Sequence, residues 1–140
     1  MELHKLTPQL SVSPQLSVED IEKAASAGFK TIICNRPDGE GDDQPASEEM
    51  QALCLSLGIK WHFLPVSPKD YTDSQALEFG ALVSQLPAPI LAYCRTGTRC
   101  TNLWALSQAD KSNADEIILS AKNAGYDLSK LRDRITNMTK

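Results

Sequence analysis

Apolar residues in this chain of 140 residues fall into short runs that alternate with segments of helical periodicity. Turns rich in proline, glycine or aspartate separate these segments, as in layered α/β proteins. The predicted buried strands are Phe29–Cys34, Ile59–Val66 and Ile90–Tyr93, and an edge hairpin is predicted from Leu3–Leu6 and Gln9–Val12. The predicted helices are Val18–Ala27, Ser47–Leu57, Thr72–Leu86, Cys100–Ala109, Asn113–Ala124 and Leu128–Met138. Capping boxes are predicted at the first and third of these helices, between Ser17 and Asp20 and between Thr72 and Gln75.

Strands and helices therefore alternate as in repeated β–α–β units. This order predicts a single α/β domain over residues 1–140, with a mostly parallel central sheet flanked by helices on both faces. Ligands of such sheets bind beyond the carboxyl ends of the strands. We therefore expect Cys34, the loop Pro65–Asp70 and Cys94 to lie on one rim of the sheet.

The loop after the last predicted strand carries the candidate chemistry. The segment Tyr93-Cys94-Arg95-Thr96-Gly97-Thr98-Arg99-Cys100 joins a strand to a helix through a turn with one glycine. Successive N–H groups of such a loop, together with the helix N-terminus, converge on a tetrahedral oxyanion. The same field lowers the pKa of a thiol, so Cys94 is predicted to be a thiolate nucleophile. Arg99 adds a planar fork for two oxygens of a phosphate or sulfate-like group.

The composition narrows the classes of function. The chain is 41% hydrophobic and 23% charged with a net charge of −4, so neither nucleic acid nor a membrane is an expected partner. The four cysteines lack CxxC or CxxH spacing, so neither a metal nor a cofactor is expected. The N-terminal residues lack a signal-peptide pattern and no apolar run has transmembrane length, which predicts a cytoplasmic protein.

Three segments together resemble the bacterial beta-lactamase-hydrolase-like, phosphatase-like family, whose fold is that of dual-specificity-type cysteine phosphatases. They are Leu16–Asp20, Cys34–Glu40 and Cys94–Arg99, and the resemblance covers roughly residues 1–110. It implies that Cys94 attacks phosphorus to form a thiophosphate intermediate. It also implies that the loop stabilises the equatorial oxygens while a carboxylic acid protonates the leaving oxygen. The implied oxyanion-binding residues are Arg95, Thr96, Gly97, Thr98 and Arg99.

The loop departs from the phosphatase pattern in three places. Tyr93 stands where those phosphatases have histidine, and Cys94 and Arg99 are separated by four residues instead of five. Cys100 follows the arginine in place of a serine or threonine that helps the thiolate leave, and Thr101 comes one residue later. The shorter loop resembles that of rhodanese-like sulfurtransferases, in which the cysteine carries a persulfide. The chain lacks the upstream Gly-His-Ile segment of rhodaneses.

The general acid has a weak signal in the sequence. Ser67 occupies the position directly after Pro65-Val66 where the family pattern expects aspartate. Asp70 lies three residues later and is the candidate acid, although a solvated loop residue is an equal alternative. Asp73 is expected to support the N-terminus of the following helix.

The remaining cysteines and the acidic loop have structural and functional interpretations. Cys34 and Cys100 are candidates to resolve an oxidised Cys94 as a disulfide, with core packing as the alternative for Cys34. Cys54 is expected in the core, and His62 is expected to be packed or at an edge. The acidic run Asp38–Asp43 is expected to be a solvated loop, with a cation site or a substrate-excluding rim as alternatives.

Three functions follow from the sequence. The first is a cysteine-dependent phosphatase-like hydrolase that acts on phosphate esters. The second is a rhodanese-like sulfurtransferase, and the third is a non-catalytic module that binds an oxyanion or a phosphorylated ligand. The expected partner is accordingly a phosphorylated or sulfur-carrying small molecule or protein, and the oligomeric state stays open.

Overall fold

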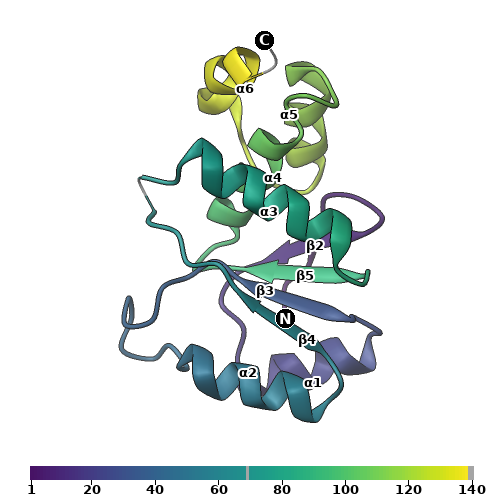
Figure 1. Ribbon diagram of the computed structural model, residues 1–140, viewed down its shortest axis with the longest axis vertical. Coiled ribbons are helices and arrows are strands. Elements are labelled where there is room, and N and C mark those ends of the chain that lie inside the picture. Colours follow the sequence, from purple (N-terminus) through teal and green to yellow (C-terminus); the bar gives the residue numbers. More distant parts are fainter. Residues whose placement is uncertain (69, 139–140) are drawn as a thin grey trace.

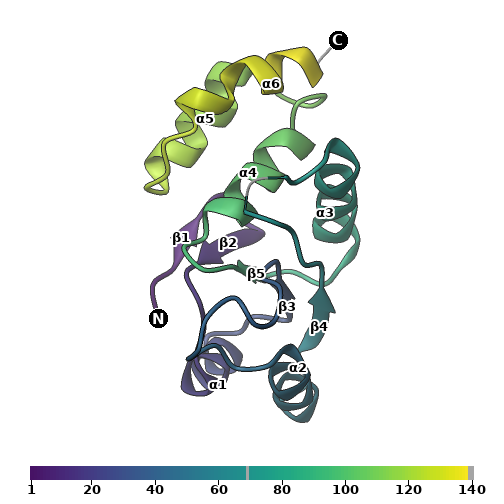
Figure 2. The ribbon, with the colours of Figure 1, turned by 90° about the vertical axis from the view of Figure 1, so that its left-hand side faces the viewer.

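The sheet at the centre of the molecule has five strands in the order β1-β2-β5-β3-β4 (Figures 1 and 2). A computed structural model describes residues 1–68 and 70–138. Strand β1 (His4–Lys5) pairs antiparallel with β2 (Leu10–Ser13), whereas β2, β5 (Ile90–Tyr93), β3 (Thr31–Cys34) and β4 (Lys60–Phe63) are mutually parallel. The predicted edge hairpin and the mostly parallel sheet are both confirmed.

Helices cover both faces of this sheet, as the sequence predicts. Helices α1 (Val18–Ser26) and α2 (Ser47–Ser56) lie on one face, and α3 (Asp73–Gln85) and α4 (Thr98–Ser107) lie on the other (Figures 1 and 2). The chain then adds α5 (Ala114–Asn123), a short 3-10 helix η1 (Ser129–Leu131) and α6 (Arg132–Met138), which pack on the outer side of α4. Within the described residues, no helix is long and apolar enough to cross a membrane.

The central strand β5 separates two apolar cores because its side chains alternate between the faces of the sheet. Ile90 and Ala92 pack into the core beneath α3 and α4, and Leu91 and Tyr93 pack into the core formed with α1 and α2. A strand buried on both faces is held rigidly, so the residue that follows Tyr93 starts from a fixed position.

Capping interactions set the helix starts. The predicted capping boxes of α1, between Ser17 and Asp20, and of α3, between Thr72 and Gln75, are both present. Helix α2 has no side-chain cap at Ala46, and a carboxylate from the preceding loop replaces it. Asp38 accepts hydrogen bonds from the Ser47 N–H at 2.8 Å and from the Ser47 hydroxyl at 2.6 Å.

Several element boundaries differ from the prediction, and two of these differences bear on the rim that carries Cys94. The strand predicted over Ile59–Val66 is limited to β4 at the sheet edge, where Phe63 is 37% exposed. Leu64 and Val66 are buried outside the strand, so their apolar character extended the pattern. Helix α4 begins at Thr98, before the predicted Cys100, because Gly97 adopts a left-handed φ of 89° and starts the helix.

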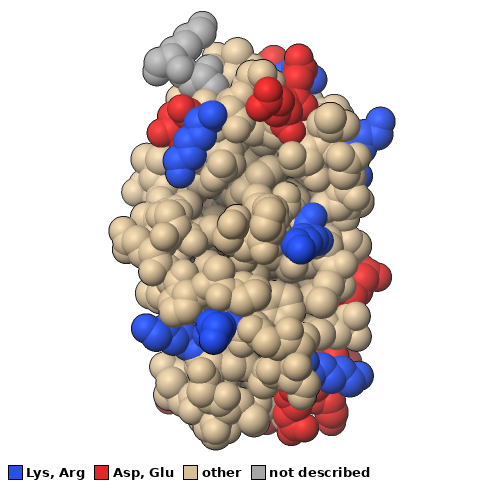
Figure 3. Space-filling view, turned by 90° about the vertical axis from the view of Figure 1, so that its right-hand side faces the viewer, with Lys and Arg blue, Asp and Glu red and all other residues tan. Residues whose placement is uncertain are grey.

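Charged side chains are scattered on the face that lies opposite the carboxyl ends of the strands. Figure 3 shows acidic and basic groups dispersed among uncharged residues on this face. The carboxyl ends of β5, β3 and β4 lie together on the other side of the molecule, which faces the viewer in Figure 2.

Candidate active site

The loop that follows β5 turns back into α4 within four residues, Cys94 to Gly97. The Cys94 N–H lies 3.4 Å from the Ser13 carbonyl, which extends the pairing of β5 with β2 beyond its last residue. Gly97 then takes the left-handed conformation, and its carbonyl accepts from both the N–H and the hydroxyl of Thr101, at 3.0 and 2.8 Å. The loop is therefore fixed at both of its ends.

The Cys94 sulfur is the point on which the donors of this loop converge. The Gly97 N–H donates to it at 3.1 Å, and the N–H groups of Cys100, Thr96 and Arg99 also favour its ionised form. The largest single cause is the Cys100 thiol, which hydrogen bonds to the sulfur. Together these donors overcome the burial of Cys94 and lower its pKa to about 5. A pKa in this range favours the thiolate form of Cys94 at neutral pH.

Cys100 has the opposite protonation state. It is fully buried in the first turn of α4, and burial, together with the neighbouring Cys94, raises its pKa well above the ordinary value. The Cys100 thiol therefore keeps its proton and donates a hydrogen bond to the Cys94 sulfur. Thr101 does not provide this donor, because its hydroxyl is bonded to the Gly97 carbonyl.

Arg99 lies beside Cys94 and is held by a carboxylate from a distant loop. Its Nη1 and Nη2 groups each donate to Glu40 at 2.8 Å, and Nη1 also donates to the Val66 carbonyl at 3.1 Å. The ion pair raises the pKa of Arg99 and lowers that of Glu40. The Arg99 side chain is 8% exposed, so its position is set by the protein rather than by solvent.

A second arginine completes this cluster. The Arg36 Nε donates to Glu40 at 3.0 Å, and the Arg36 Nη1 donates to the Gln15 side chain at 3.0 Å. The acidic residues of this loop are exposed as predicted, but two of them also have partners that the sequence did not reveal: Glu40 binds two arginines and Asp38 caps α2. The sequence did contain a signal, because Arg36 and Glu40 belong to the loop that follows β3 on the rim that carries Cys94.

Among the other residues of the predicted oxyanion loop, Gly97 is buried and the remaining three face solvent. Arg95, Thr96 and Thr98 are exposed. The Thr96 hydroxyl donates to the Thr98 hydroxyl at 2.9 Å and accepts from the Thr98 N–H at 3.3 Å. The Arg95 carbonyl accepts from the Gln15 N–H at 3.2 Å. These bonds stiffen the loop, whereas the Arg95 side chain is left at the surface.

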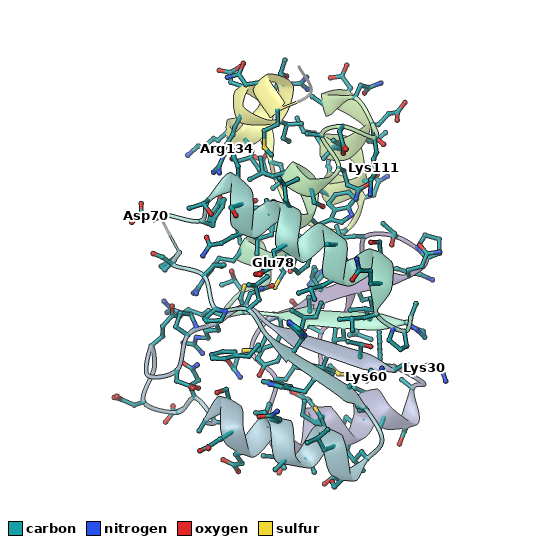
Figure 4. All side chains as sticks on the ribbon, in the orientation of Figure 1. Lys30, Lys60, Asp70, Glu78, Lys111 and Arg134 are labelled. Atoms are coloured by element: carbon teal, nitrogen blue, oxygen red, sulfur yellow. The ribbon has the colours of Figure 1, made fainter. Side chains whose placement is uncertain are left out.

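The candidate acid is not brought against the sulfur. Asp70 is exposed on the loop between Val66 and α3, beyond the ends of the strands (Figure 4). Among the described residues, no hydrogen bond joins Asp70 to the Cys94 loop. Ser67 is likewise exposed on this loop. The structure therefore assembles Cys94, Arg99 and the loop donors but leaves the acid apart.

The end of the acid loop is attached to the C-terminal helix. Arg134 of α6 donates to the Tyr71 carbonyl at 3.0 Å and to Asp73 at 2.7 Å, and it lies over the Tyr71 ring at 5.4 Å. Asp73 is in the first turn of α3 as predicted, and its ion pair with Arg134 was not expected.

The remaining cysteines lie below the site. Cys34 is buried at the end of β3, where burial raises its pKa and its thiol donates to the Arg36 carbonyl at 3.4 Å. Cys54 belongs to the core as predicted, and burial raises its pKa to about 12. Tyr93 is buried between Cys34 and Trp61, so the residue in the histidine position points away from solvent into the second core. Among the described residues, no cluster of histidine, cysteine or acidic side chains is arranged to hold a metal.

The sheet topology and the strand–loop–helix around Cys94 are those of the cysteine-phosphatase fold. The core catalytic domain of the PP-IP phosphatase Siw14 from S. cerevisiae matches it with a TM-score of 0.72 at 15% identity, over 100% of this chain and 86% of that chain.

The chain belongs to the family of beta-lactamase hydrolase-like proteins, phosphatase-like domain, whose model matches residues 2–111. The family predicted from the sequence is thus confirmed, and the domain is phosphatase-like. A candidate phosphatase from Neisseria meningitidis is 41% identical, with a TM-score of 0.89 over 99% of both chains. A beta-lactamase hydrolase-like protein from Xylella fastidiosa is 28% identical over 93% of this chain, which spans only 31% of that relative.

Proposed function

We propose that the chain is a cysteine-dependent phosphatase that hydrolyses phosphate monoesters through a Cys94 thiophosphate intermediate. The observation that carries this proposal is the convergence of hydrogen-bond donors on the Cys94 sulfur, from Cys100 and from its own loop, which lowers the pKa of Cys94 to about 5. A thiolate held among N–H groups is both a nucleophile and the centre of an oxyanion site. The substrate would be a phosphorylated small molecule or a phosphorylated protein.

Arg99 retains a fork for the phosphate despite its pairing with Glu40. An arginine side chain has five N–H groups, and three of those of Arg99 are bonded to Glu40 and Val66. The Nε–H and the second Nη2 hydrogen lie on one edge of the guanidinium and have no bond to any described residue. This edge would bind two equatorial oxygens, while Glu40 holds the two Nη groups at the end of the guanidinium in place.

The chemical step would begin when the Cys94 thiolate attacks phosphorus. The S–P bond forms as the bond between phosphorus and the leaving oxygen breaks, and the leaving oxygen takes a proton from an acid or from water. Water then attacks phosphorus, inorganic phosphate departs and the thiolate is regenerated. The Cys100 thiol would stabilise the departing thiolate with the hydrogen bond that it already donates in the free protein.

Asp70 remains the candidate acid. Its loop is attached at Tyr71 and Asp73 to α6, whereas Asp70 itself is exposed. An exposed carboxylate transfers protons less effectively than one placed against the leaving group. We therefore propose weak phosphatase activity with a preference for substrates whose leaving groups need no protonation.

A sulfurtransferase is the second candidate, because the loop has four residues between Cys94 and Arg99, as in rhodaneses. In that reaction Cys94 would take a sulfane sulfur and carry it as a persulfide, with the anionic donor held by Arg99. A module that only binds an oxyanion is the third, since the acid is displaced from the sulfur.

Mass spectrometry of the intact protein separates the three candidates. The protein is treated in parallel with an aryl phosphate, stopped rapidly in acid, and with thiosulfate, and Cys94→Ser serves as the control. A phosphate adduct on Cys94 that forms together with steady phosphate release supports the proposal. A sulfur adduct indicates the transferase, and phosphate binding without an adduct or turnover indicates the binding module. Phosphate release that continues in Cys94→Ser at the wild-type rate would refute the covalent mechanism.

A further inference from the structure

A tyrosine from the C-terminal helices contacts the Cys94 loop from outside the sheet. Tyr126 lies between α5 and η1, and its hydroxyl donates to the Thr96 carbonyl at 3.0 Å. The Tyr126 hydroxyl also lies directly over the Gly97 Cα, where a Cβ atom on Gly97 would overlap it. Tyr126 is beyond residues 2–111, which the family model matches.

The Tyr126 hydroxyl binds the carbonyl of the Thr96–Gly97 peptide, and the N–H of the same peptide faces Cys94. The Thr96 carbonyl and the Gly97 N–H belong to the same planar trans peptide, so they point in opposite directions. Tyr126 bonds the carbonyl, and the Gly97 N–H donates to the Cys94 sulfur at 3.1 Å. The bond from Tyr126 therefore favours the orientation in which the N–H points toward the sulfur.

This peptide needs such a restraint because of the residue that follows it. Gly97 has a φ of 89° and lacks a Cβ atom, so it adopts either orientation of the preceding peptide at little cost. In the reversed orientation the Thr96 carbonyl oxygen would face the Cys94 thiolate and any bound oxyanion. Two negative groups in contact would raise the free energy of both the thiolate and the bound phosphate.

Tyr126 is itself held in place. Its N–H donates to the Ala121 carbonyl at 2.8 Å, and its ring packs edge-on against His4, with ring centres 5.1 Å apart. His4 in turn contacts the Ala124 carbonyl at 2.7 Å and Glu2 at 2.8 Å. Burial, together with nearby Cys100 and Cys94, raises the pKa of Tyr126 to about 12, so its hydroxyl remains a donor at all pH values of interest.

We propose that Tyr126 is a positioning residue that orients the Thr96–Gly97 peptide so that the Gly97 N–H faces Cys94. The proposal rests on the proposed function in one respect, namely that the Cys94 loop is the oxyanion site. Tyr126 does not contact the reacting atoms, and it acts only through the peptide that it holds.

Tyr126→Phe in the full chain tests the proposal because it removes the hydroxyl and keeps the ring. The rate of Cys94 alkylation by iodoacetamide is measured against pH, together with turnover of an aryl phosphate. Loss of one hydrogen bond predicts a rise in the apparent pKa of Cys94 and a fall in kcat/KM of about threefold to tenfold. In a nitrogen–proton NMR spectrum of Tyr126→Phe, the chemical shift of the Gly97 amide should also change less than in wild type as Cys94 ionises.

The matched control is Asp127→Ala, which removes a hydrogen bond to the Ser129 N–H in the same loop and does not contact Thr96. This variant should keep the wild-type alkylation profile. A Tyr126→Phe profile and Gly97 signal identical to wild type would overturn the proposal. If the wild type itself shows no turnover, the proposed phosphatase function fails, whereas the alkylation profile still decides the role of Tyr126.

Discussion

The Cys100 thiol offers the sharpest test of the site, because it is the largest cause of the low pKa of Cys94. Replacing Cys100 with alanine removes the S–H donor and leaves the loop N–H groups unchanged. A hydrogen bond to a charged group contributes about 1.5–3 kcal/mol. Since one pKa unit corresponds to about 1.36 kcal/mol, the pKa of Cys94 should rise by roughly one to two units from its value of about 5.

The sign and size of the effect depend on pH. The alkylation rate follows the thiolate fraction, so wild type should reach its plateau above about pH 6. At pH 6, Cys100→Ala should react roughly twofold to tenfold more slowly than wild type, given that rise in pKa. Above about pH 9 the two proteins should react at similar rates, because Cys94 is then ionised in both.

The assay is iodoacetamide alkylation between pH 4.5 and pH 9 (about half-unit steps), followed by peptide mass spectrometry that resolves Cys94 from the other cysteines. Cys34 and Cys54 are suitable internal references, because burial raises their pKa values and they should react slowly. Cys100→Ser is the matched variant, since its hydroxyl keeps a donor and should preserve most of the shift. Identical profiles for wild type and Cys100→Ala would refute the role of Cys100. A wild-type rate that still rises above about pH 8 would refute the thiolate itself.

Three further predictions address the surrounding residues. Glu40→Gln removes the charge that fixes Arg99, so it should lower the free energy of unfolding by about 1.5–3 kcal/mol in urea titrations at neutral pH and weaken phosphate binding. Because the pKa of Glu40 is lowered in the folded state, the stability difference between wild type and Glu40→Gln should disappear as pH falls through that lowered pKa. The same urea midpoint for both proteins at neutral pH would contradict the prediction. Asp70→Asn should slow aryl phosphates with poor leaving groups more than those with good ones, and equal slowing of both would remove Asp70 as the acid. Hydrogen peroxide should oxidise Cys94 to a sulfenic acid, and the Cys100 thiol should then form a disulfide with Cys94 and release water. Peptide mapping identifies the disulfide, and a bond between Cys94 and Cys34 would assign the resolving role to Cys34 instead.

The sequence predicted the Cys94 loop because every signal for that loop is local. A strand end, a cysteine, one glycine and an arginine occur within eight residues, and each has a conformational or chemical meaning by itself. The apolar run Ile59–Val66 was less informative, because hydrophobic periodicity reports burial and not backbone pairing. Leu64 and Val66 are buried without belonging to β4, and the run therefore overstated the strand.

The partners of the loop were missed for the opposite reason. Glu40 is 59 positions from Arg99, and Tyr126 is 30 positions from Thr96. An exposed acidic loop and a tyrosine between helices are common features with many structural roles. Only the folded chain shows which residues they contact. Capping interactions, by comparison, span three residues, and both predicted capping boxes were correct.

The C-terminal helices have a consequence for the modularity of the domain. Arg134 of α6 holds the start of α3, and Tyr126 holds the Cys94 loop, so this appendage touches both segments that would handle a phosphate ester. A fragment trimmed at residue 111, where the family match ends, would keep the sheet and every residue of the loop itself. It would also uncover the apolar side of α4 that α5 and α6 cover. The smallest transplantable unit therefore extends through α6, and grafts or fusions should place their junction after that helix.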